Sequence, residues 1–130
     1  MMLTDEEREA ANALFATFNS KAMAQMSAEA GKTDFASEIM PLAMENVFGR
    51  LWIRPGLDKR ARSLLTLGIL IALQAHAELK VHILIALANG LTVQEIEEVI
   101  YHSTGYAGFP AANGARAVAV EALRMEGVIS

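Results

Sequence analysis

Two residues in the stretch HAELKVH (76–82) have the types and the spacing of an acid–base pair. Glu78 and His82 are four positions apart, which on an α-helix leaves their side chains roughly 40° apart around the axis and able to meet. A carboxylate beside an imidazole raises the pKa of the histidine and orients its ring, as a general acid or base requires. The alternative is an exposed helical pair that contributes a few tenths of a kcal/mol. Spacing alone favours that alternative.

A second pair with the same spacing is His102 and Tyr106, just before a glycine-containing turn. Either the histidine complements the dipole at a helix C-terminus, or both side chains line a pocket. A metal site would need a third ligand near the histidines, and no spacing in this chain matches a recognised zinc pattern. We therefore predict no metal.

The densest group of cations surrounds the segment RPGLD, and it consists of Arg50, Arg54, Arg60 and Arg62. Taken singly, each is most simply a solvated surface charge. Taken together, they are suited to bidentate capture of carboxylates. Arg54 and Arg62 are the candidates that we retain for substrate binding.

Composition excludes several classes of protein. The chain has no cysteine, which removes disulfides, thiolate metal sites and thiol catalysis. Its net charge is −4, and no run of Lys and Arg forms a footprint for phosphates, so we predict no nucleic-acid partner. The apolar fraction of 53% excludes a disordered chain. At 130 residues, we predict a single domain over 1–130.

The sequence gives no sign of a membrane or a secretory signal. The N-terminal stretch MMLTDEEREA is acidic, whereas a signal peptide begins with basic residues and continues with apolar ones. The apolar run over 64–73 is roughly half of the about 20 residues that span a bilayer. We predict a cytoplasmic protein with no membrane partner.

Hydrophobic periodicity predicts an all-α fold of about six helices. Capping boxes at Thr4 with Glu7 and at Thr92 with Glu95 each open a helix, and Asp34 and Asp58 are further N-cap candidates. The predicted helices cover 4–28, 34–48, 58–73, 76–88, 92–104 and 110–126, with a structured loop over 49–58 and a kink near Gln74. The run over 64–73 is apolar nearly all round, which predicts burial on every side. A chain of this size has little room for such a helix, so we expect a homo-oligomer.

Three segments together resemble the carboxymuconolactone decarboxylase family over residues 35–125. They are FGRLWIRPGLDKRARSLLTLGILIAL, HAELKVHILIALANGLTVQEIEEVIYH and YAGFPAANGARAVAVEAL. Redox members of the wider alkylhydroperoxidase D-like superfamily carry a CxxC pair, three intervening residues and then a histidine. Placing that histidine on His82 puts the two cysteine positions at Ala75 and Glu78, and an upstream glutamate of the redox relatives falls on Ser63. The resemblance is therefore to the cysteine-free decarboxylases, and cysteine-dependent peroxidase activity is excluded.

The resemblance implies an alkylhydroperoxidase D-like fold with helices interlocked between subunits, as a trimer or hexamer. It implies a carbon–carbon lyase of aromatic degradation, in the β-ketoadipate pathway, that converts 4-carboxymuconolactone into 3-oxoadipate enol-lactone and CO2 without a cofactor. On this basis we assign His82 as proton donor and electrophile, Glu78 as its partner or proton shuttle, and Arg54 as carboxylate clamp. Arg62, His102 and Tyr106 are weaker candidates for the substrate pocket.

Two other functions stay open. One is a lactone hydrolase or isomerase that uses the same histidine and glutamate on a related ring. The other is a non-catalytic oligomeric scaffold or binding protein, which predicts that Glu78 and His82 face bulk water. Either enzyme predicts a partly buried pocket that holds both side chains.

Overall fold

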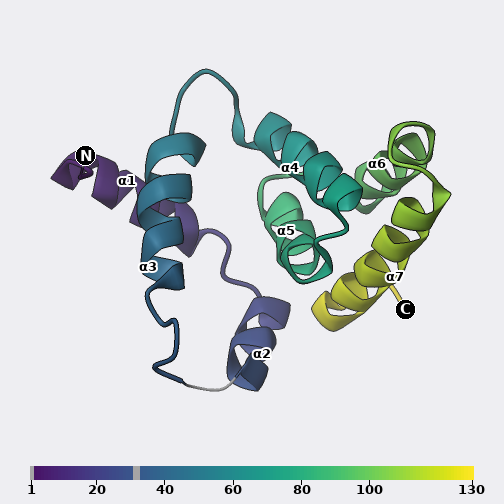
Figure 1. The fold of residues 1–130 in the computed structure, drawn as a ribbon, viewed down its shortest axis with the longest axis horizontal. Helices are drawn as coiled ribbons and strands as arrows, with labels where there is room; N and C mark the ends of the chain where they lie inside the picture. Colours follow the sequence, from purple (N-terminus) through teal and green to yellow (C-terminus); the bar gives the residue numbers. More distant parts are fainter. Residues whose placement is uncertain (1, 31–32) are drawn as a thin grey trace.

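The computed structural model describes residues 2–30 and 33–130, and within these ranges it is all helical, as predicted (Figure 1). The helices are α1 (Asp5–Ala16), α2 (Lys21–Ala30), α3 (Ile39–Ala43), the π-helix η1 (Met44–Trp52), α4 (Lys59–Leu73), α5 (His76–Ala88), α6 (Val93–Tyr106) and α7 (Phe109–Glu126). The described residues thus hold seven α-helices where the sequence predicts about six.

Local signals at the helix ends are confirmed. The capping boxes Thr4–Glu7 and Thr92–Glu95 are both present. Asp58 caps α4 by accepting a hydrogen bond from the backbone N–H of Ala61 at 2.7 Å. The kink near Gln74 is a complete break, because Gln74 adopts the left-handed conformation with φ of 54° and ends α4. The redirected chain begins α5 at His76.

The single first helix predicted over 4–28 is wrong. α1 ends at Ala16 and α2 begins at Lys21. The Thr17 hydroxyl donates to the carbonyl of Leu14 at 2.6 Å, and the Ser20 hydroxyl accepts from the N–H of Met23 at 3.1 Å. Short polar side chains compete in this way for the backbone groups that a continuous helix would use.

The boundaries predicted around the next helix are also wrong. Asp34 does not cap it, since regular helix begins only at Ile39, and the predicted loop from Gly49 onward is helical as far as Trp52. Gly49 is needed for close packing rather than for a turn. A Cβ at this position would lie 2.2 Å from Cδ1 of Leu3 and 2.9 Å from the carbonyl oxygen of Met44.

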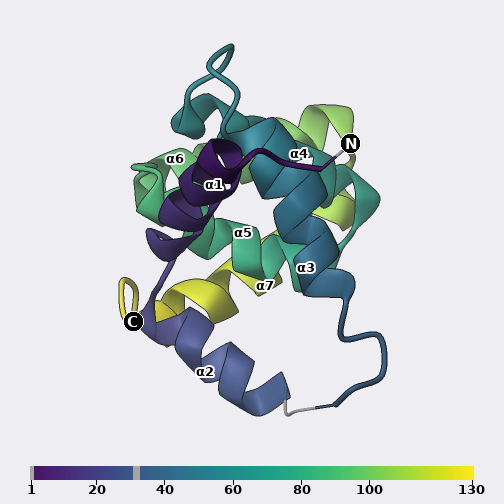
Figure 2. The same ribbon diagram turned by 90° about the vertical axis from the view of Figure 1, so that its left-hand side faces the viewer.

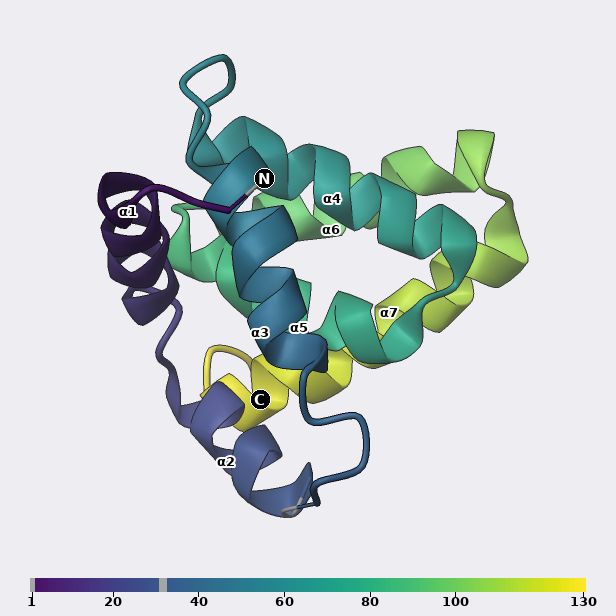
Figure 3. The same cartoon turned by 60° about the vertical axis from the view of Figure 1, so that its left-hand side comes forward.

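The helices build two hydrophobic cores. The first, which we call the aliphatic core, lies among α4, α5, α6 and α7, and α4 passes over α5 and α7 in Figure 3. Small side chains let α7 approach α5 closely: its buried residues are Ala111, Ala112, Ala115, Ala119, Ala122 and Leu123. α2 packs against α7 near the C-terminus (Figure 2), where the N–H of Ala22 donates to Oε1 of Glu126 at 3.5 Å.

The second core, which we call the aromatic layer, joins α1 and η1 to one side of α5. It contains Leu14, Phe18, Phe48, Trp52 and Ile85. Phe18 contacts Phe48 and Trp52 at centroid distances of 5.8 and 6.2 Å, in the tilted and edge-on arrangements that aromatic pairs favour.

α4 is not buried on every side within one chain. Ser63, Leu67 and Ile71 face the aliphatic core. On its other faces Leu64, Leu65, Ile69 and Leu73 are exposed, Leu65 to 57% and Leu73 to 70%. In the part of the chain that the structure describes, no helix has both the length and the hydropathy needed to cross a membrane.

Candidate active site

His82 projects from α5 against the aromatic layer. Its ring stacks on the indole of Trp52, with centroids 6.1 Å apart and planes 21° from parallel. Trp52 is the last residue of η1 and is itself buried, whereas His82 is half-buried. The site therefore forms where the C-terminal end of η1 meets the middle of α5.

The electrostatics of His82 differ from the expectation for an acid–base pair. Burial lowers the pKa of its imidazole below 6.5, where a neighbouring carboxylate would raise it. Its Nδ1 is buried and has no hydrogen-bond partner. At neutral pH the ring is accordingly an uncharged imidazole in an apolar setting.

Glu78 lies in the first turn of α5 and is exposed. No hydrogen bond or ion pair connects it to His82 in the described structure. The neighbouring Lys80 pairs instead with Glu121 of α7 at 2.8 Å. The helical spacing thus leaves Glu78 one turn from His82 without joining the two, and their joint action remains a prediction.

The four arginines around the RPGLD segment have different partners. Arg60 binds both carboxylate oxygens of Glu95 and the carbonyl of Gly90. The hydrogen bond from Arg60, and after it the one from the Thr92 N–H, lower the pKa of Glu95 to about 2. Arg50 approaches Glu45 at 3.8 Å. Arg62 donates to the carbonyls of Leu57 at 3.2 Å and of Arg54 at 3.0 Å, which fixes the loop before α4.

Arg54 differs from the other three, because its guanidinium has no protein partner among the residues of 2–30 and 33–130. It is exposed and borders a pocket of about 490 Å³ beside η1. The pocket is lined by Leu3, Glu7, Gly49, Arg50, Leu51, Ile53, Arg54 and Pro55. Of the predicted arginines, Arg54 is thus the one free to bind an anion.

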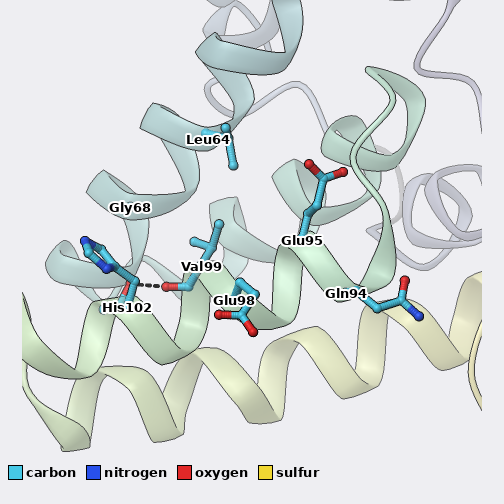
Figure 4. Close-up of a pocket in the computed structure, with 8 residues that line it drawn as sticks. Leu64, Gly68, Gln94, Glu95, Glu98, Val99 and His102 are labelled. Atoms are coloured by element: carbon cyan, nitrogen blue, oxygen red, sulfur yellow. Dashed lines mark hydrogen bonds between the residues drawn. The ribbon is translucent and has the colours of Figure 1, made fainter.

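His102 and Tyr106 contact each other at the end of α6, with ring centroids 5.1 Å apart. His102 lines a groove of about 600 Å³ between α4 and α6, together with Leu64, Gly68, Gln94, Glu95, Glu98, Val99 and Ser103 (Figure 4). Tyr106 is 86% exposed and does not line this groove. The pocket interpretation therefore fits His102 better than Tyr106.

The predicted site residues occupy three places in one chain. His82 lies against Trp52, Arg54 borders the pocket beside η1, and His102 lies in the groove between α4 and α6. Arg54 and Arg62 are brought together only through a backbone carbonyl. Sequence reasoning missed Trp52 as a site residue, because its segment was interpreted as a loop. The signal available was a single large aromatic residue directly before the arginine-rich segment.

A metal site finds no support in the described chain: no three His, Asp or Glu side chains of 2–30 and 33–130 gather as a metal-binding group. The remaining polar chemistry is that of a neutral imidazole, an exposed carboxylate and an unpaired guanidinium. These groups can donate hydrogen bonds to developing negative charge, exchange protons with water and bind a carboxylate.

The helical arrangement is consistent with the alkylhydroperoxidase D-like fold. The chain belongs to the carboxymuconolactone decarboxylase family, whose sequence model matches residues 38–121. It is 37% identical over 95 residues to the 4-carboxymuconolactone decarboxylase of Acinetobacter baylyi, which covers 73% of this chain and 71% of that protein.

Two further relatives match a shorter stretch. The nitrosuccinic acid decarboxylase of Metarhizium robertsii is 44% identical over 78 residues, which is 60% of this chain and 54% of that protein. An uncharacterised 15.0 kDa protein of Paracoccus denitrificans is 38% identical over 78 residues, 58% of each chain. Both relatives with a named activity are decarboxylases, which supports a decarboxylase within this family.

Proposed function

We propose that this protein is a cofactor-free decarboxylase of a small carboxylated lactone, with 4-carboxymuconolactone as the first candidate. The observation that carries the proposal is the placement of His82, half-buried against Trp52, in a chain 37% identical to a 4-carboxymuconolactone decarboxylase. A scaffold that used the fold only for packing would have no reason to hold an uncharged histidine with an unpartnered nitrogen in this position.

The reaction defines what the site must do. When CO2 leaves the γ-carbon, the bonding electrons pass through the ring alkene to the lactone carbonyl and form a dienolate. One proton then adds at the α-carbon, so each turnover consumes one carboxylate and one proton and releases CO2 and the enol-lactone. The protein must stabilise the oxyanion, deliver the proton and hold the leaving carboxylate out of the ring plane.

His82 is suited to the first two tasks. An uncharged imidazole can donate a hydrogen bond to a carbonyl oxygen on which charge develops, and apolar surroundings strengthen that interaction. We assign His82 as electrophile and proton donor. Glu78, exposed one turn away on α5, is assigned as the shuttle that takes the replacement proton from water.

Arg54 is suited to bind the carboxylate that the substrate keeps, and this anchors the ring in an orientation that leaves the other carboxylate out of the ring plane. The substrate keeps a second carboxylate, and a guanidinium binds such a group through two parallel hydrogen bonds. Because Arg50, Arg60 and Arg62 already have protein partners, Arg54 is the one that can do so without breaking an existing contact. Arg62 contributes indirectly, by holding the loop that carries Arg54.

A second substrate class is favoured by one comparison. Nitrosuccinic acid, named for the relative that is 44% identical, also has two carboxyl groups and an oxygen-bearing group that can accept the electrons left by CO2. The same assignment serves it, with the nitro oxygens in place of the lactone carbonyl. A nitro-substituted dicarboxylic acid is therefore the second candidate.

The experiment is a turnover assay on both substrates. Purified protein is mixed with 4-carboxymuconolactone or nitrosuccinate, and released CO2 is measured together with the ultraviolet absorbance of the ring. CO2 from the lactone supports the proposal, and CO2 from nitrosuccinate alone transfers it to the second class. Ring opening without CO2 indicates the hydrolase or isomerase alternative, and no reaction with either substrate contradicts the decarboxylase.

We also propose that the chain assembles as a homo-oligomer, a trimer or hexamer. The exposed apolar side chains of α4 form more open apolar surface than the scattered apolar residues that a monomer usually exposes. Light scattering after size-exclusion chromatography measures the mass. A monomer at micromolar concentration would contradict the proposal, and Leu65→Glu should shift an oligomer to smaller species.

A further inference from the structure

Trp52 is held so firmly that it can set the orientation of a neighbouring ring. It is buried, and Phe18 and Phe48 contact it at centroid distances of 6.2 and 6.1 Å with planes at 72° and 27°. One aromatic ring meets its indole edge-on while the other stacks, so the two neighbouring rings restrict the orientations open to the indole. The face that Trp52 presents to His82 is therefore fixed by the aromatic layer.

The two ring nitrogens of His82 are in different situations. Only Nδ1 is both buried and without a hydrogen-bond partner. A buried N–H with no acceptor is rarer and more costly than a buried lone pair with no donor. The proton of the neutral ring therefore belongs on Nε2, which is the nitrogen left to reach a ligand.

No charged group near His82 forms an ion pair with its ring in the described structure. Glu78 on α5 forms no ion pair with His82, and Arg50 at the end of η1 is near Glu45. Arg54, in the loop that follows η1, lies in a separate pocket. α1 and the turn that follows it contribute Leu14, Phe15 and Phe18 to this region, and none of them is charged. The contact that the structure gives for the ring is the stacked face of Trp52.

We propose that Trp52 is a positioning residue that holds His82 as the neutral tautomer protonated on Nε2, with that N–H presented to the substrate. This inference deepens the proposed function, and it rests on that function only for what the N–H does in turnover. Trp52 does not touch the reacting atoms. It acts by excluding water from Nδ1 and by fixing the plane of the imidazole.

A competing effect gives the inference a clear test. The face of an indole attracts cations, so Trp52 could instead favour the imidazolium form. If shielding dominates, removal of the indole lets water reach Nδ1 and raises the pKa of His82 toward 6.5. If the cation–π attraction dominates, the same removal lowers the pKa.

The test combines NMR with kinetics on the full chain. Histidine ring ¹⁵N shifts of the wild type, Trp52→Phe and Trp52→Leu report the tautomer and the pKa of His82, and thermal melts confirm that each variant is folded. We expect the wild type to show one tautomer protonated on Nε2. Trp52→Leu should show mixed tautomers and a raised pKa, and Trp52→Phe, which keeps a stacked ring, should remain close to the wild type.

In the turnover assay, Trp52→Leu should lower kcat by about 10- to 100-fold with a smaller change in KM, and Trp52→Phe should restore most of the loss. A wild-type ring protonated on Nδ1, or a pKa of His82 unchanged or lowered in Trp52→Leu, would overturn the inference. Because the NMR measurement needs no substrate, it separates failure of this inference from failure of the proposed decarboxylase.

Discussion

The aliphatic core and the aromatic layer are built on opposite principles, although α5 contributes to both. Along α7 the buried residues are nearly all alanine, so helix backbones pack closely and no side chain can serve a ligand. In the aromatic layer four large side chains from α1, the turn after it and η1 meet α5, and a polar ring, His82, is part of the arrangement. We infer that the aliphatic core fixes the position of α5, whereas the aromatic layer sets the surroundings of His82 and therefore what its side chain can do.

The largest expected effect falls on the side of the aromatic layer. His82→Gln should lower kcat on the lactone by about 100- to 10,000-fold, because a positioned acid or base contributes that much. Its thermal midpoint should change little, since the half-buried ring has no hydrogen bond at Nδ1 to lose. The matched control is His76→Gln, at the start of the same helix. Equal losses in the two variants would remove His82 from the mechanism.

Next in size is a truncation in the aliphatic core. Leu67→Ala should lower the free energy of unfolding by about 2–5 kcal/mol, and the volume-conserving Leu67→Met by less than about 1.5 kcal/mol. Urea unfolding is followed by far-UV circular dichroism and by the fluorescence of Trp52, the one tryptophan in the chain. Coincident transitions would show that the two cores unfold together. A fluorescence change at lower urea would show that the aromatic layer opens first.

A smaller change should follow from crowding the contact between η1 and Leu3, next to the aromatic layer. Gly49→Ala should cost about 1–3 kcal/mol, because its Cβ would overlap the side chain of Leu3 and approach the backbone at Met44. Gly105→Ala, where a Cβ meets nothing within 4 Å, is the control and should be neutral or stabilising. The measurement is chemical unfolding of both variants. If the two alanine variants were equally stable, Leu3 would not pack on η1 as described.

The smallest effect concerns pH. Burial depresses the pKa of His82, so the unfolded chain binds a proton at this residue before the folded chain does. Its contribution to stability is intact above the unperturbed value of 6.5 and is lost progressively as pH falls below it. Unfolding free energies of the wild type and His82→Gln at about pH 7.5 and about pH 5.5 measure this difference. The wild type should lose more stability on acidification, and equal losses would contradict a buried neutral ring.

Features governed by neighbours in sequence could be predicted. The all-α class, the caps at Thr4, Asp58 and Thr92 and the break at Gln74 depend on hydrogen bonds or dihedrals within a few residues. The role of Gly49 could not be predicted, because the side chain that requires a glycine there, Leu3, is 46 positions away. In the sequence, Gly49 looks like a turn residue. The same reason explains why the last four residues of η1, 49–52, fall within the loop that the sequence predicts.

The candidate site was predictable in its residue types but not in their partners. The sequence predicts His82 as a site residue, which stays a prediction; in the structure its ring contacts Trp52, thirty positions earlier, rather than the expected partner Glu78. Four arginines close in sequence look equivalent until Glu95 of α6 engages Arg60 and Glu45, within η1, approaches Arg50. For Arg60 the contact is between α4 and α6, and no pattern near Arg60 in the sequence indicates it.

The alanines of α7 have a thermodynamic consequence. A methyl side chain has no rotatable torsion that changes its shape, so burying it costs no rotamer entropy, whereas each buried leucine or methionine costs some. Because these alanines have no alternative rotamers, α7 contributes a surface of nearly fixed shape to its contact with α5. The α5 backbone that carries His82 is thus supported on one side by this surface, and heating should loosen the aromatic side of α5 before the alanine side.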